Sequence, residues 1–170
     1  MSRSLLRSGL LPAALILLFA LPAAADNGED RRVRRALEDA DVEFSVNDSD
    51  NFRIVWNCNT DGRTQLVIVN SRTENFRGME LREIWSVASR SDNPVSASRM
   101  AELLSDNARK KVGAWQIILP REDRPSDRHL VVFQIVLPAD ADGDELRSAI
   151  IACAEEADRL ENDWVGTDDL

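Results

Sequence analysis

The sequence contains one histidine, no tyrosine and two cysteines in 170 residues. Because the chain has no tyrosine and no second histidine, a general acid–base pair would have to come from carboxylates. The single histidine, His129, follows a polar segment at the start of an expected strand. No G-x-S-x-G motif supplies it with a nucleophilic serine. The pattern around His129 is typical of an exposed histidine at a strand end, and no catalytic residue is predicted.

Motifs that bind phosphates or metals are also absent from the sequence. There is no P-loop and no dinucleotide fingerprint. The stretch DADGDE at 140–145 resembles a calcium loop, but the twelfth position counted from Asp140 is Ile151 instead of the required glutamate. Asp142 and Glu145 instead have the spacing of a capping box that opens a helix. We therefore expect no metal site and no cofactor.

Long hydrophobic runs are confined to the N-terminus. Residues 1–25 combine Arg3 and Arg7, an apolar run at 10–21 and small residues at 23–25, which is the layout of a secretory signal peptide. The apolar run is too short to span a hydrocarbon core of about 30 Å, and no cysteine follows it to carry a lipid anchor. We expect cleavage after residue 25 and a bacterial protein that is periplasmic or secreted. The mature chain, residues 26–170, would be a single domain with a short acidic tail.

Positive charge is scarce relative to negative charge. The chain has 21 basic and 30 acidic residues, a formal net charge of −9. Removal of the signal peptide takes away two arginines and no acid, which leaves −11. Such a surface repels phosphate-bearing partners, so nucleic acids and anionic membranes are excluded as expected partners.

The two lysines of the chain, Lys110 and Lys111, lie side by side in the stretch NARKKVGAWQII. With Arg109 they occupy the expected last turn of a helix, where cations stabilise the unpaired carbonyl groups by about 0.3 to 1 kcal/mol each. Gly113 offers a left-handed cap, and Trp115 begins the next strand. This pattern favours a junction between two elements over a basic docking patch.

Hydrophobic periodicity predicts three helices and five strands in the order α-β-β-β-α-β-β-α. Asp61-Gly62 supplies a tight turn between the first two strands. Ser96 or Ser98 can cap the middle helix. The expected helices cover 29–44, 91–113 and 143–162, and the expected strands cover 51–58, 64–71, 79–89, 114–120 and 129–138. The fold class is therefore α+β, with a mostly antiparallel five-stranded sheet and the helices as a second layer on one face.

Cys58 and Cys153 both fall on apolar faces of their expected elements. Cys58 continues the alternating face of a strand, and Cys153 lies on the apolar stripe of the last helix. Export makes a disulfide chemically accessible, and a bridge closing so long a loop contributes about 4 kcal/mol in the chain-entropy model. The alternative is two buried thiols that act as small hydrophobic side chains. The sequence leaves both states open.

Four stretches of the chain resemble the YbjN-like family, described as sensory-transduction regulators and related in fold to type III secretion chaperones. They are NFRIVWNCNTDGRTQLVIV, LREIWSVASR, LLSDNARKKVGAWQI and LPADADGDELRSAI. The resemblance covers most of 31–162 and implies a curved antiparallel sheet, helices packed on it, frequent dimerisation through the middle helix, and binding of extended client segments. It implies no catalytic site. The expected export departs from the secretion chaperones, which are cytosolic.

These observations predict a non-enzymatic binding, adaptor or chaperone-like protein that contacts a protein or peptide partner and forms a homodimer. The candidate interface residues are Trp85, Met100, Leu104 and Trp164, because exposed tryptophans are frequent anchors of interfaces. Two alternatives remain open. One is a small periplasmic hydrolase that uses carboxylates or His129, and the other is a small-ligand sensor that uses the concave sheet face.

Overall fold

A computed structural model describes residues 28–58, 62–124 and 126–164 of the chain. The predicted signal peptide lies outside these described residues, as does most of the acidic tail. Within the described ranges, no helix has the length and apolar character needed to cross a membrane. In chain order the elements are α1 (Arg31–Asp39), β1 (Ser45–Val46), β2 (Phe52–Asn57), β3 (Thr64–Phe76), β4 (Met79–Ser91), α2 (Ala97–Asn107), β5 (Ala114–Ile118), β6 (His129–Pro138) and α3 (Gly143–Trp164).

The strands form one open sheet in the order β1-β2-β3-β4-β6-β5, and every neighbouring pair is antiparallel. The predicted α+β class and antiparallel pairing are therefore confirmed. The predicted number of five strands is wrong, because β1 adds a sixth strand at the edge next to β2. A strand of two residues is too short to produce an alternating pattern, so the sequence gives no signal for it.

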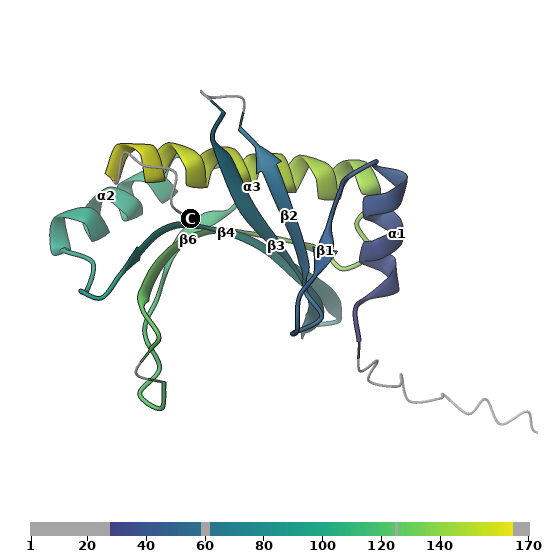
Figure 1. The fold of residues 1–170 in the computed structure, drawn as a ribbon, viewed down its shortest axis with the longest axis horizontal. Coiled ribbons are helices and arrows are strands. Elements are labelled where there is room, and N and C mark those ends of the chain that lie inside the picture. The colour runs from purple at the N-terminus through teal and green to yellow at the C-terminus, as the bar shows by residue number, and fades with distance from the viewer. Residues whose placement is uncertain (1–27, 59–61, 125, 165–170) are drawn as a thin grey trace, which may run out of the picture.

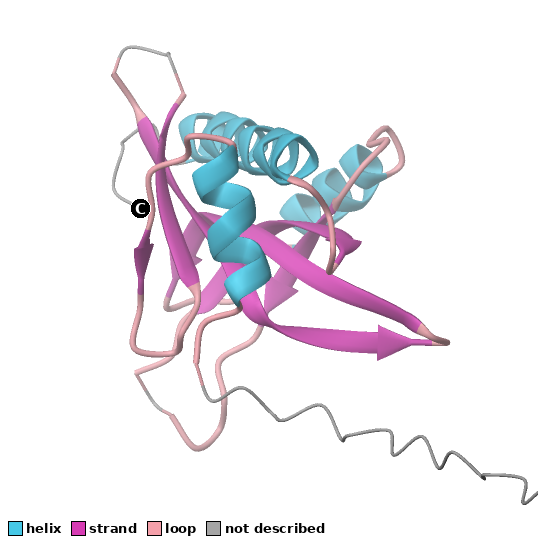
Figure 2. Ribbon diagram, turned by 90° about the vertical axis from the view of Figure 1, so that its right-hand side faces the viewer, coloured by secondary structure: helices cyan, strands magenta, loops and turns pink. Residues whose placement is uncertain are grey.

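All three helices contribute to one hydrophobic core on one face of the sheet. α3 lies across the sheet and contacts β2, β3, β4 and β6 (Figure 1). α1 packs against α3, and α2 contacts β5, so the helices lie together on one side of the strands (Figure 2). The buried stripe of α3 repeats every three or four residues, as the sequence predicts: Leu146, Ile150, Cys153, Ala157 and Leu160.

The opposite face of the sheet carries no helix in the described part of the chain (Figure 1). The β3–β4 and β5–β6 hairpins bend away from α3, so this face is concave (Figure 1). Ile68, Trp85 and Gln134 lie in one row across three neighbouring strands on it. Ile68 and Val132 on this face are nevertheless buried, because the curvature brings neighbouring side chains together.

Gly143 allows the start of α3 to pack closely against α1. A Cβ atom at this position would lie 2.7 Å from the carbonyl oxygen of Ala36. A larger residue would therefore push the two helices apart. At the same end of α3, the predicted capping box is confirmed: the Asp142 amide donates to Glu145 Oε2 at 3.1 Å, and the Glu145 amide donates to Asp142 Oδ1 at 2.9 Å.

Candidate functional site

The α2 helix exposes two of the four predicted interface residues. Met100 and Leu104 are 40% and 70% exposed, and Leu103 is the one residue of α2 that is buried. Residues four apart lie on the same face of a helix, so Met100 and Leu104 form a short apolar stripe on the surface. Ser96 caps the helix by accepting from the Arg99 amide. Of the two predicted caps, Ser96 is therefore the one that accepts this bond.

The two tryptophans of the predicted interface, Trp85 and Trp164, are half-buried. Trp85 is on the concave sheet face, where its Nε1–H donates to Asn70 Oδ1 at 3.1 Å. Trp164 is the last residue of α3, and the guanidinium of Arg99 lies 4.5 Å from the centroid of its ring. The structure therefore brings Trp164 close to α2 through Arg99, whereas Trp85 belongs to a separate surface.

The two cysteines are thiols in the structure. Cys153 is fully buried in α3, and its Sγ donates to the Phe133 carbonyl at 3.1 Å. Burial raises the pKa of the Cys153 thiol to about 12. Cys58, the residue after β2, is half-buried, and its Sγ contacts the Trp56 carbonyl at 4.0 Å. Cys153 therefore remains protonated and packs as a small apolar side chain.

His129 is the first residue of β6 and pairs with Ser91 of β4. Its Nδ1 is buried and has no hydrogen-bond partner among the described residues. Among the described residues, no carboxylate therefore accepts a hydrogen bond from this nitrogen. Within the same ranges, no group of three or more His, Cys, Asp or Glu side chains is arranged to hold a metal ion.

The lysine-containing stretch is a junction among α2, α3 and β5. Lys110 Nζ lies 3.1 Å from Asp106 of α2 and 2.6 Å from Glu156 of α3. Asp106 also accepts from Arg159 of α3 and from Trp115 Nε1 of β5. Burial opposes ionisation of Asp106, but hydrogen bonds from Trp115 and Lys110 outweigh it and lower its pKa to about 2. α2 ends at Asn107, so the predicted placement of Lys110 inside its last turn is wrong.

Gly113 has φ +73°, the left-handed conformation expected of it, but it lies beyond the helix end and therefore does not cap the helix. A Cβ atom there would lie 2.7 Å from the Gln134 carbonyl and 2.8 Å from the Phe133 ring. The glycine is required by the close approach of the chain to β6.

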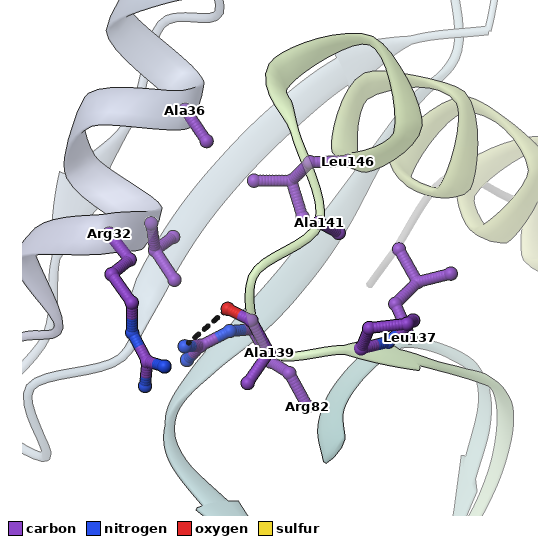
Figure 3. Close-up of a pocket in the computed structure, with 9 residues that line it drawn as sticks. Arg32, Ala36, Arg82, Leu137, Ala139, Ala141 and Leu146 are labelled. Carbon is purple, nitrogen blue, oxygen red and sulfur yellow. Dashed lines mark hydrogen bonds between the residues drawn. The ribbon is translucent and has the colours of Figure 1, made fainter. Parts of the chain in front are cut away.

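A buried arginine, Arg82 of β4, links the sheet to the start of α1. Its Nη2 donates to Asp30 Oδ2 at 2.5 Å and lies 3.4 Å from the Ala139 carbonyl, toward which the guanidinium points (Figure 3). Arg32 of α1 lies on the other side and bridges Asp30 to Glu80. Burial of Asp30 opposes its ionisation, but the hydrogen bonds from Arg32 and Arg82 lower its pKa to about 2.

The cavity between α1 and the loop before α3 has a volume of about 10 Å³ (Figure 3). This space fits about one water molecule, so it is too small for an organic ligand. Desolvation lowers the pKa of Arg82, and its contact with Asp30 offsets part of that effect. The contacts of Arg82 with Asp30 and Ala139 therefore hold the start of α1 against the sheet.

A second buried polar cluster connects the β2–β3 hairpin to α3. Arg63 Nε donates to Asp158 Oδ1 at 2.6 Å, and Arg63 Nη2 donates to Glu161 Oε2 at 3.0 Å. Gln65 Nε2 donates to the same Glu161 oxygen at 2.5 Å, and Ser86 Oγ donates to Gln65 Oε1. Glu161 is fully buried, so loss of its donors would leave an uncompensated charge in the core.

Neither of these two clusters is predicted from the sequence. The sequence does contain polar residues at alternating core positions. Gln65 precedes Val67 and Val69 on the core face of β3, and Arg82 precedes Ile84 on the core face of β4. A polar residue at an alternating core position indicates a buried partner. The partner itself is far away in sequence and cannot be named from that pattern.

A shallow groove of about 340 Å³ runs along the outer edge of β2. One wall is β2, and the other is the segment that leads from α1 into β1. Arg147 of α3, which is exposed, also lines the groove. The lining residues are Asp41, Val42, Glu43, Ile54, Val55, Trp56, Asn57 and Arg147. The groove combines apolar side chains, two carboxylates and one guanidinium beside a strand edge, a composition suited to holding a peptide.

Comparison with known proteins found no matching family model, no matching curated protein and no matching solved structure.

Proposed function

We propose that the chain is an exported, non-enzymatic binding or adaptor protein of the YbjN-like, chaperone-like kind, and that it acts as a homodimer through α2. The observation that carries the proposal is the apolar stripe of Met100 and Leu104 on a helix that buries one residue. An isolated exposed leucine is common, but two apolar residues on one helical face provide a continuous contact surface. Val112, just after the helix, is exposed as well.

The α2 helix is suited to this role because it is fixed without using the stripe. Polar contacts of Asp106 and Asn107 attach its C-terminal end to α3 and β5. Residues 100 and 104 therefore remain available to a second helix. Two copies of the stripe related by a twofold axis would cover each other, as in an isologous dimer interface.

The proposal predicts that Leu104→Glu converts a dimer into a monomer without unfolding the chain. The reason is that this side chain is 70% exposed, so a carboxylate there is solvated in the monomer and buried in the dimer. Mature protein would be compared by light scattering coupled to size exclusion over a range of concentrations.

Met79→Glu provides the matched control, because Met79 is also exposed but lies at the β3–β4 hairpin. We expect this variant to dimerise like the wild type. A wild-type protein that stays strictly monomeric and retains no protein or peptide from a periplasmic extract would contradict the proposal.

A further inference from the structure

At its outer edge, β2 is paired with β1 at two of its six residues. β1 pairs with β2 at Arg53 and Phe52 and reaches no further toward the β2–β3 hairpin. The Asn47 amide donates to the Asn51 carbonyl on the β1 side, and the Cys58 amide donates to Arg63 on the β3 side. Because backbone groups alternate along a strand, the amide and carbonyl of Val55 point to the outer edge. Among the described residues, no backbone group pairs with them there.

The end of α1 explains why β1 stops. The Val42 amide donates to the Leu37 carbonyl at 2.9 Å, and the Asp41 amide donates to the Glu38 carbonyl at 3.1 Å. With Asp41 at φ +52°, these bonds form a Schellman motif. The motif fixes the direction in which the chain leaves the helix. In the register of β1, Glu43 would stand opposite Val55, but the segment that leads into β1 and the strand β2 diverge from each other (Figure 1).

The divergence creates the groove described above. Val55 is 69% exposed on the sheet side, and Val42 and the half-buried Trp56 provide apolar surface deeper in the groove. Asp41 and Glu43 line the opposite wall, and both are exposed. Arg147 is the single cation that lines the groove, so the lining carries a net negative charge, as does the whole chain.

We infer that this groove binds an extended peptide that alternates apolar and basic residues and adds as a strand to the open edge of β2 at Val55. The inference rests on the proposed binding function and names the kind of partner segment and its site. Strand addition uses backbone hydrogen bonds for affinity and alternate side chains for specificity. Basic side chains of the peptide would face Asp41 and Glu43, and its apolar side chains, which point to the other face of the added strand, would cover Val55.

The other edge of the sheet differs at the corresponding place. At β5, the side chain of Asn107 accepts from the Trp115 amide at 2.7 Å and donates to the Trp115 carbonyl at 3.2 Å. A carboxamide thus occupies the place of a neighbouring strand and blocks that edge, a protection that edge strands commonly receive. No such side chain covers Val55 among the described residues.

Val55→Pro tests the backbone contact directly. Proline removes the outward amide, and the strand should tolerate it because that amide makes no bond within the sheet. Val55→Thr is the matched control, because it keeps the amide and the β-branched shape. The probe is a fluorescent peptide that alternates valine and lysine over about eight residues.

We expect the probe to bind the wild type and Val55→Thr, and Val55→Pro to bind about tenfold or more weakly in fluorescence anisotropy. The same peptide with alternate N-methyl groups should not bind, and a valine–glutamate peptide should bind more weakly. Amide hydrogen exchange at Val55 should slow when the probe is added. Glu43→Gln should weaken binding severalfold at low salt and less at high salt.

The inference would be overturned if Val55→Pro binds the probe as tightly as the wild type does and the N-methylated peptide also binds. It would equally be overturned if the folded wild type does not bind the probe. The oligomeric state of Leu104→Glu distinguishes failure of the groove inference from failure of the proposed function. If the chain is monomeric but the probe still protects Val55, then dimerisation through α2 is wrong and the groove is confirmed. If Leu104→Glu abolishes a dimer and the probe never binds, then the groove is wrong.

Discussion

The backbone conformation of Asp41 determines the direction in which the chain leaves α1. Its φ of +52° lies in the left-handed region, which costs most L-residues roughly 1 to 2 kcal/mol. Helices commonly place glycine at this position, and aspartate is one of the few residues that tolerate it. The conformation directs the chain away from β2 and so keeps the edge at Val55 open.

We predict that Asp41→Gly raises the free energy of unfolding by about 1 kcal/mol and that Asp41→Ala lowers it by a similar amount. Both variants lose the same carboxylate, so the difference between them isolates the backbone effect. Urea unfolding followed by circular dichroism provides the measurement. Equal stabilities for the two variants would show that the left-handed conformation is not maintained in solution.

At the scale of a single element, α2 is attached to the rest of the molecule mainly through polar contacts. It buries Leu103, whereas Asp106 contacts Trp115, Lys110 and Arg159 from three different segments. Such an attachment leaves the apolar stripe exposed, and the proposed homodimer would use this stripe as its contact. It also makes the position of α2 dependent on one carboxylate.

Asp106→Asn should therefore loosen α2 while the sheet remains folded. The asparagine can still accept from Trp115, but the ion pairs with Lys110 and Arg159 are lost, at a cost of roughly 1 to 2 kcal/mol. Amide hydrogen exchange should become faster in α2 and stay unchanged in β3 and β4. Glu102→Gln, which neutralises an exposed carboxylate of the same helix, should leave the exchange rates of α2 unchanged.

Across the whole molecule, charged clusters join elements that are distant in sequence. Asp30 connects α1 to β4, Glu80 accepts from Arg32 of α1, and Asp106 connects α2 to α3 and β5. Hydrogen bonds from Arg32 and Thr73 lower the pKa of Glu80 to about 2, the same value as for Asp30 and Asp106. All three carboxylates are thus more acidic in the folded state than in the unfolded state.

A carboxylate with a lowered pKa in the folded state stabilises the fold above its unfolded pKa of about 4. That stabilisation is lost as the pH falls through the folded pKa. We predict that stability stays nearly constant from neutral pH to about pH 4 and then falls between about pH 4 and pH 2. Urea midpoints measured across this range test the prediction. A decline that is already complete at pH 4 would contradict it.

The sequence by itself determined the order and type of the main elements, the antiparallel pairing and the capping box of α3. These features depend on alternation, helical spacing and turn residues within short windows, so neighbouring residues are sufficient to specify them. Gly62, with φ +77°, has the left-handed conformation predicted for the β2–β3 turn, whereas Asp61 lies outside the described residues. The sequence also indicated Met100 and Leu104 as candidate interface residues, and both are exposed in the structure.

Only the tertiary structure decided which charged residues are buried and where the sheet edge stays open. Arg63 and Glu161 are 98 positions apart, and Arg82 and Asp30 are 52 apart. A buried ion pair depends on the packing of whole elements, which leaves no periodic trace along the chain. The groove at Val55 arises because the cap of α1 and the short β1 diverge from β2, so it depends on the relative directions of three segments.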